Sequence, residues 1–334
     1  MLYRDMTFCL LFILVACDPT TSQPSDSETE TPPTGTEIAS TETAAPVPDT
    51  YEETLHLFDY DMQAPLTITE NSVQHENKYT VHDIYYPSPK GGNVTSYLLV
   101  PDGKGPFAGI ILMHGSSGSR ESLLPLAKDL VPTGAVVLTI DGPAARIKNR
   151  DWIHFTPQDR DEQIQLIVDL CRGVDVLTAR PSVDATRIGY IGYSYGAAMG
   201  GLLAGVEPRI KAYGLMVGDG GLVNHFTDSD RPVSGFESVP SAARDAWLKA
   251  MEPIEPIHFV SHASPSALFF QNARRDTLVS EADALAYQAA GSEPKRVEWY
   301  DSGHGLPTQA YFDMVNWLEE QIGIDATKFK GPTS

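Results

Sequence analysis

Short apolar runs alternate with amphipathic stretches along the chain from residue 94 onward. A short apolar run is typical of a strand buried on both faces, whereas apolar residues three or four positions apart indicate a helix. This pattern predicts strands at 94–100, 107–113, 135–140, 187–193, 210–217, 266–271 and 296–300. It predicts helices at 121–130, 158–178, 197–203, 281–290 and 308–322. Strands that alternate with helices form a mostly parallel sheet covered on both faces, so the predicted fold class is α/β.

The segment 219–258 interrupts this alternation and contains one helical pattern, at 242–251. Functional residues of a parallel sheet lie at the carboxyl ends of its strands. We therefore interpret the segment as an insertion over those ends and call residues 219–258 the lid; the alternative is a surface excursion without a role in binding. The apolar side chains expected to wall a substrate pocket are Leu222, Val223, Phe226, Phe236, Trp247 and Leu248.

The N-terminal residues 6–16 are apolar but too few to span a bilayer as a helix. Their length is that of the apolar region of a signal peptide, and Arg4 supplies a positive charge before it. The run ends in Leu-Val-Ala followed by Cys17, which resembles a bacterial lipobox. The resemblance implies a lipoprotein signal peptide at 1–16, lipid on Cys17, export, and anchoring to the outer face of the cell membrane or its periplasmic side. The alternative is an ordinary secretory signal.

Residues 17–50 are rich in Thr, Ser, Pro and Glu and contain seven acidic residues but no Lys or Arg. Such a segment cannot bury enough apolar surface to offset the entropy lost on ordering. We predict a disordered tether at 17–50 and a folded domain at 51–334 that includes the lid.

Charge and cysteine content exclude several classes of function. The formal net charge of −20 makes nucleic acid an unfavourable partner. Cys171 is the one cysteine of the folded domain, so that domain cannot hold an internal disulfide, and its apolar context predicts a buried thiol. Neither a CxxC nor an HExxH spacing occurs, so we expect no metal and no other cofactor.

A candidate nucleophile lies in Gly192-Tyr193-Ser194-Tyr195-Gly196, between a predicted strand and a predicted helix rich in small residues. In a GxSxG nucleophile elbow the serine sits on a tight, strained turn, so the flanking positions must lack bulk. The helix N-terminus behind the serine favours developing negative charge. The motif in this context predicts Ser194 as a catalytic nucleophile.

The serine needs a base and a carboxylate that orients it. Four histidines follow Ser194, and only His304 lies in a turn between glycines that follows a strand and precedes the last helix. Asp276 ends the predicted strand region before it, giving the chain order nucleophile, acid, base. Asp301 is the alternative acid, but it lies only three residues from His304.

A second motif, His114-Gly115-Ser116-Ser117-Gly118, follows the strand predicted at 107–113. Together with the elbow, the Asp276 turn, Gly303-His304 and Tyr97-Leu98-Leu99-Val100-Pro101, it resembles the α/β-hydrolase superfamily, in its dienelactone-hydrolase-like and acetyl-xylan-esterase-like branch. Dienelactone hydrolase itself uses a cysteine nucleophile where this chain has Ser194, so its substrate is not implied.

The resemblance implies an oxyanion hole whose two donors are the amides of Ser116 and Tyr195, with His114 shaping the loop. It implies a cofactor-independent serine hydrolase that acts on a small-molecule carboxylic ester. Two alternatives remain at this point. One is a serine peptidase resembling the prolyl-oligopeptidase catalytic domain, although its N-terminal propeller is missing here; the other is a non-catalytic binding lipoprotein on the same fold.

Overall fold

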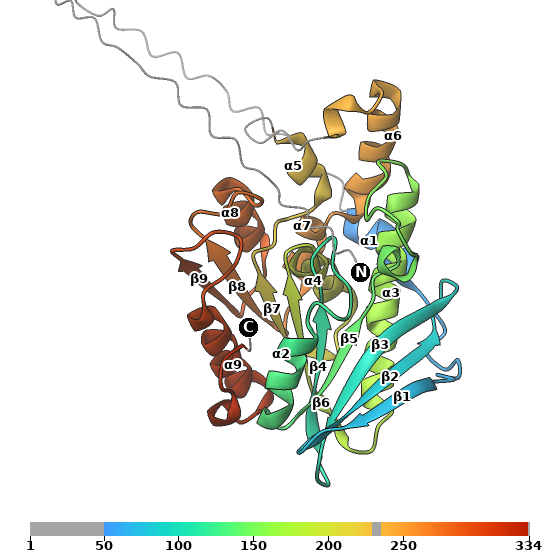
Figure 1. The fold of residues 1–334 in the computed structure, drawn as a ribbon. Coiled ribbons are helices and arrows are strands. Elements are labelled where there is room, and N and C mark those ends of the chain that lie inside the picture. Colours follow the sequence, from blue (N-terminus) through green and yellow to red (C-terminus); the bar gives the residue numbers. More distant parts are fainter. Residues whose placement is uncertain (1–49, 229–234, 333–334) are drawn as a thin grey trace, which may run out of the picture. The chain divides into compact units, whose positions relative to one another are not determined.

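The computed structural model describes residues 50–228 and 235–332. Within these ranges the chain forms a nine-stranded sheet in the order β1-β2-β3-β5-β4-β6-β7-β8-β9 (Figure 1). The strands are β1 (Thr69–His75), β2 (Tyr79–Pro87), β3 (Asn93–Pro101), β4 (Phe107–Met113), β5 (Ala135–Ile140), β6 (Val183–Tyr193), β7 (Ile210–Met216), β8 (Ala267–Ala273) and β9 (Lys295–Tyr300). Cys17, the predicted signal peptide and the predicted tether up to residue 49 lie outside the described residues.

The sheet is parallel from β5 through β9 and antiparallel from β1 through β3, including the pairing of β3 with β5. This arrangement confirms the predicted α/β fold with a mostly parallel sheet. Strands β1 and β2 are not predicted by the apolar runs, because β1 is almost wholly exposed and β2 alternates buried and partly buried positions. Strand β1 lies at the edge of the sheet and β2 lies between β1 and β3, and such partly exposed strands are specified by pairing with their neighbours more than by a run of apolar residues.

Helices cover both faces of the sheet (Figure 1). One face packs against α3 (Gln158–Thr178), α4 (Tyr195–Val206), α7 (Pro256–Phe259) and α8 (Glu281–Ala290). The opposite face packs against α2 (Leu124–Leu130) and α9 (Thr308–Ile322). A short α1 (Thr50–Thr54) precedes the sheet. None of the helices in the described ranges combines the length and apolarity needed to cross a membrane.

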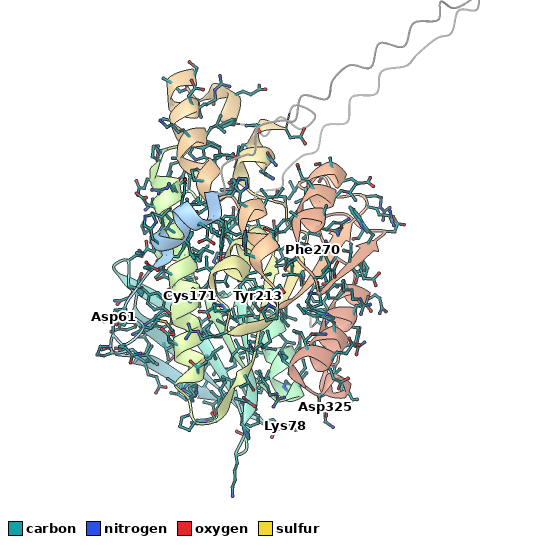
Figure 2. All side chains as sticks on the ribbon, turned by 180° about the vertical axis from the view of Figure 1, so that it is seen from behind. Asp61, Lys78, Cys171, Tyr213, Phe270 and Asp325 are labelled. Atoms are coloured by element: carbon teal, nitrogen blue, oxygen red, sulfur yellow. The ribbon has the colours of Figure 1, made fainter. Side chains whose placement is uncertain are left out.

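The core beneath α3 and α4 is seen from behind in Figure 2, where Cys171 and Tyr213 are labelled near the middle of the molecule. The thiol of Cys171 is buried, and burial raises its pKa well above the ordinary value. Tyr213 on β7 is fully buried and donates a hydrogen bond to the Glu207 carbonyl at 2.8 Å. The prediction that Cys171 is a buried thiol is therefore confirmed.

The lid forms α5 (Leu222–Thr227), α6 (Ser241–Met251) and α7 in the part that the structure describes. Its buried apolar side chains make a third hydrophobic cluster, separate from the two that flank the sheet. Trp247 is fully buried there and donates a hydrogen bond from its indole nitrogen to Asp159 Oδ2 at 2.8 Å. This bond ties α6 to the first turn of α3, at the end of the sheet where the parallel strands terminate.

Candidate active site

Ser194 lies at the turn between β6 and α4 with a φ of 54°, a left-handed conformation that non-glycine residues seldom adopt. The amide of Ser194 donates to the Met216 carbonyl at 2.8 Å, and its own carbonyl accepts from the amides of Ala197 and Ala198 at 2.7 and 3.0 Å. These bonds from β7 and α4 offset the strain, which is on the order of 1–3 kcal/mol. The side chain is thereby fixed at the carboxyl edge of the sheet, before the N-terminus of α4.

Two glycines of the elbow are required by close backbone contacts. A Cβ atom on Gly192 would lie 2.2 Å from the Gly196 carbonyl oxygen, and one on Gly196 would lie 2.3 Å from the Met113 carbonyl oxygen. Real Cβ atoms do not approach backbone oxygens this closely. The spacing of the GxSxG motif is therefore explained by β6 and α4 packing against each other and against the end of β4.

A continuous hydrogen-bonded relay joins Ser194 to a carboxylate. His304 Nε2 lies 2.9 Å from Ser194 Oγ, and His304 Nδ1 lies 2.9 and 3.0 Å from the two oxygens of Asp276. The side chain of Asp276 is 4% exposed and that of His304 is 17% exposed. Since an ionised carboxylate only accepts, Nδ1–H donates to Asp276, and the lone pair of Nε2 is left to accept the serine proton.

Asp276 is held in its ionised form. Burial by itself would raise the pKa of Asp276, but hydrogen bonds from His304 and from the amides of Val279 and Leu278 outweigh it, so the pKa falls below its ordinary value. The amide bonds measure 3.0 and 2.8 Å. The turn after β8 thus stabilises the negative charge that orients His304.

The alternative acid, Asp301, does not contact His304. Its side chain is 80% exposed and pairs with Arg275, Nε to Oδ1, at 3.1 Å. Three residues of a tight turn cannot fold Asp301 back onto the imidazole while β9 continues into this loop. Of the two candidate carboxylates, the structure brings only Asp276 to the base.

The two amides expected in the oxyanion hole lie beside Ser194. A Cβ atom on Gly115 would be 3.4 Å from Ser194 Cβ, so the loop after β4 passes directly against the nucleophile. Ser116 and Tyr195 line one common cavity. Among the described residues neither amide has a hydrogen-bond acceptor. Two unpaired N–H donors next to a nucleophile are what an oxyanion requires.

His114 fixes the position of that loop. Its Nδ1–H donates to the Gly115 carbonyl at 2.7 Å, and its Nε2 accepts from the Gly142 amide at 3.1 Å. Burial lowers the pKa of His114, in keeping with this neutral tautomer. Asp141 adds a second tie, because its carboxylate accepts from the Arg120 amide at 2.7 Å and from Thr95 Oγ1 at 2.5 Å. The loops after β4 and β5 are therefore linked behind the site.

Tyr193 holds the other side of the site and was not among the residues predicted from the sequence. Its hydroxyl donates to the His304 carbonyl at 2.7 Å, and its ring lies 5.6 Å from the imidazole. The only sequence signal was its place as the variable residue before the serine. The bond connects the nucleophile strand directly to the histidine loop.

The lid meets the site through aromatic contacts. Trp152, from the loop after β5, lies 5.7 Å from the Tyr195 ring and 6.0 Å from Phe226. Phe226, Phe236 and Trp247 are buried in the lid cluster. Of the lid side chains expected to wall a pocket, Leu222 is the one that lines the cavity beside Ser116 and Tyr195. The larger aromatic side chains of the lid thus pack within its own cluster and do not line the cavity.

A larger hollow of about 910 Å³ lies next to this cavity and shares Pro143 and Glu162 with it. Its arginines are each paired with a carboxylate: Arg146 with Asp169, Arg150 with Glu162, and Arg160 with Asp161. In the described ranges no group of three or more His, Cys, Asp or Glu side chains could hold a metal ion.

A family model and curated proteins that match this chain are described as FrsA-type esterases. The family model described as Esterase FrsA-like matches residues 62–233. Esterase FrsA of Shigella boydii serotype 18 is 30% identical over 135 residues, which are 40% of this chain and 30% of that protein. The corresponding esterase of Escherichia coli O157:H7 is 29% identical over 139 residues. The matched part of this chain thus spans about a third of the length of these relatives.

Solved structures share the fold. Acetyl xylan esterase from Paenibacillus sp. R4 superposes with a TM-score of 0.67 at 19% identity, covering 81% of this chain and 93% of that one. Acetyl xylan esterase 1 from Thermoanaerobacterium sp. JW/SL YS485 gives a TM-score of 0.65 at 16% identity, covering 82% and 93%. Both confirm the α/β-hydrolase architecture predicted from the motifs.

The lowered pKa of Asp276 leads to a pH-dependent stability. A group whose pKa is depressed on folding stabilises the native state above its unfolded pKa, near 3.9 for aspartate, and this contribution is lost as the pH falls through the folded value. We expect Asp276→Asn to lower the free energy of unfolding by about 1–2 kcal/mol at pH 7, and by less below pH 4.

Urea unfolding of both proteins from pH 7 down to pH 2.5 measures this difference. Asp301→Asn is the matched control, since its carboxylate is exposed and should show a small difference throughout. A difference for Asp276→Asn that stays constant or widens below pH 4 contradicts the prediction.

Proposed function

Because the chain belongs to the Esterase FrsA-like family, we propose that it is a serine hydrolase that cleaves carboxylic esters through an acyl-enzyme on Ser194. The observation that carries the proposal is the relay from Ser194 Oγ to His304 Nε2, 2.9 Å apart, and from His304 Nδ1 to Asp276. The strained backbone of Ser194 and the unpaired amides of Ser116 and Tyr195 support the same conclusion.

The proposed reaction has two halves. Ser194 Oγ attacks the ester carbonyl while His304 Nε2 takes its proton, and the resulting oxyanion accepts hydrogen bonds from the Ser116 and Tyr195 amides. Asp276, kept ionised, stabilises the imidazolium that forms. His304 then gives the proton to the departing alcohol oxygen, which leaves an acyl-serine. A water molecule, deprotonated by the same histidine, hydrolyses this ester and regenerates Ser194.

Ester hydrolysis is proposed in preference to the two alternatives. The family and the similar structures are esterases, which does not favour a peptidase or a binding lipoprotein. The relay also argues against a non-catalytic role, because a binding protein gains nothing from a serine held at a strained φ of 54°. The substrate is accordingly a small-molecule ester.

The nucleophile is tested by Ser194→Ala. Loss of a triad serine should reduce kcat for p-nitrophenyl acetate by about 10⁴-fold or more while leaving the fold intact. A fluorophosphonate probe should label the wild-type protein and not the variant, as read by mass spectrometry. Ser72→Ala, on the exposed edge strand β1, is the matched control and should keep both activity and labelling. Labelling or turnover that survives in Ser194→Ala removes the proposal.

We also propose that the lid closes the site against water. Support comes from Leu222, which lines the cavity beside Ser116 and Tyr195, and from Trp152, which links Tyr195 to Phe226 of the lid. Exclusion of water lowers the local dielectric and strengthens the hydrogen bonds to a developing oxyanion. In this proposal the lid and the loop after β5 together form the wall that limits the substrate.

Leu222→Ala tests the lid as a wall. Removing this side chain enlarges the cavity, so the ratio of kcat/KM for p-nitrophenyl butyrate over acetate should rise by roughly tenfold, the usual worth of one or two methylenes in a pocket. Leu248→Ala is the control within the lid, because Leu248 packs against the same cluster without lining the cavity. An unchanged ratio in Leu222→Ala means that the lid is scaffold only.

The location of the enzyme is proposed from residues outside those that the structure describes. The lipobox ending at Cys17 supports export and a lipid anchor, and the acidic segment 17–50 supports a tether between anchor and domain. Cys17→Ser should abolish incorporation of radiolabelled palmitate and shift the protein from the membrane fraction to a soluble or unprocessed form. Wild-type protein that is recovered soluble, with residue 18 or later at its N-terminus, overturns the anchor.

A further inference from the structure

The cavity beside the Ser116 and Tyr195 amides is small and is lined in part by polar side chains. Its volume is about 30 Å³, which is room for about two water-sized groups. Ser116, Tyr195 and Leu222 line it together with Asp159 and Gln163 of helix α3. A group that extends a little beyond the reacting carbonyl therefore reaches the first turns of α3.

The cavity lies on the acyl side of the substrate. His304 must protonate the departing oxygen, so the alcohol lies toward His304. The cavity is lined by the oxyanion loop, the loop after β5, α3 and the lid, and among the described residues that line it none comes from β8, β9 or the loops after them. An ester whose carbonyl oxygen faces the Ser116 and Tyr195 amides thus directs its acyl group into this cavity.

Gln163 is the unusual residue of that lining. Its side chain is 2% exposed and contacts the Tyr195 hydroxyl, and beyond that contact neither its amide nitrogen nor its carbonyl oxygen has a hydrogen-bond partner among the described residues. A buried unpaired amide costs on the order of 1–3 kcal/mol, so it calls for a partner.

The neighbouring polar side chains of α3 are already satisfied. Asp159 accepts from the His154 and Thr156 amides and from the Trp247 indole, and Glu162 pairs with Arg150. The Gln163 amide has two N–H groups and two carbonyl lone pairs, so after its contact with the Tyr195 hydroxyl it still has both donor and acceptor capacity for a ligand.

We propose that Gln163 recognises a hydroxyl group on a short acyl chain, so that the preferred substrates are esters of small hydroxy acids, such as hydroxyacetyl esters. The inference rests on the proposed function and adds the acyl class to it. A hydroxyl both donates and accepts, as the free amide does, and two non-hydrogen atoms fill the volume available. A carboxylate is disfavoured, because Asp159 and Glu162 also line the cavity.

The test compares two acyl groups of equal size. We measure kcat/KM for p-nitrophenyl hydroxyacetate and p-nitrophenyl propionate, each divided by its rate constant for hydroxide hydrolysis, which removes the difference in intrinsic reactivity. In the wild-type enzyme the corrected ratio should favour hydroxyacetate by roughly tenfold or more, since an apolar analogue leaves the buried amide unpaired. In Gln163→Met, which has nearly the same shape without the amide, the ratio should fall to about one.

Gln165→Met is the matched control. Gln165 lies on the same helix but bonds to the Gly91 carbonyl at 2.8 Å and does not line this cavity, so the variant should keep the wild-type ratio. Thermal unfolding checks the fold: Gln163→Met should melt at or above the wild-type temperature, because an unpaired buried amide has been removed.

The outcomes separate this inference from the proposed function. A wild-type ratio near one, or a ratio that Gln163→Met leaves unchanged, means that bound water satisfies the amide, and overturns the acyl preference. If Ser194→Ala abolishes hydrolysis of both esters in the same experiment, the serine hydrolase proposal stands regardless. Hydrolysis that persists in Ser194→Ala overturns both.

Discussion

The left-handed backbone of Ser194 is the constraint on which the rest of the site depends. The chain must pass from β6 into α4 within one residue, and it does so only because Gly192 and Gly196 let backbone atoms meet at distances that any Cβ atom would forbid. The energetic cost of this strained conformation is offset by the hydrogen bond from the Ser194 amide to the Met216 carbonyl and by those that the Ser194 carbonyl accepts from the first turn of α4. The turn places the Ser194 hydroxyl at the carboxyl edge of the sheet, next to the N-terminus of α4.

Around that fixed point, four separate loops are locked to one another. His114 joins the loops after β4 and β5, Asp276 holds the imidazole of His304, and Tyr193 bonds to the His304 backbone. Two of these ties use a group whose protonation state is set by its surroundings: burial keeps His114 neutral, and three donors keep Asp276 ionised. Preorganisation of this kind supplies oriented charge without rearrangement during the reaction.

The lid is stabilised by a hydrophobic cluster of its own. Its aromatic cluster is separate from both cores of the sheet and is tied to α3 by the bond between Trp247 and Asp159. Truncating Trp247 therefore removes support from the same helix turn that presents Gln163 to the cavity. With the proposed role of Gln163, stability of the lid and selectivity of the pocket are coupled through α3.

The parallel half of the fold could be predicted from the sequence alone, because its strands are buried on both faces and read as unbroken apolar runs. It also determined the elbow, since only small residues fit where β6 meets α4. Strands β1 and β2 were not predicted, because both are partly exposed and depend on pairing with neighbouring strands and not on an apolar run. Within the site, Ser194, His304 and Asp276 could be proposed from order and spacing along the chain.

The partners of the side chains in the site follow from tertiary contacts and could not be read from spacing along the chain. Asp301 is nearer to His304 in sequence, yet the turn after β8 delivers Asp276 to the imidazole and leaves Asp301 paired with Arg275. Gln163 and Tyr193 could not be identified from the sequence, because their surroundings come from segments distant in the chain. Gln163 lines a cavity formed with other loops, and the Tyr193 hydroxyl bonds to the loop that carries His304. Local motifs fix backbone geometry, whereas side-chain partners are chosen by packing between elements.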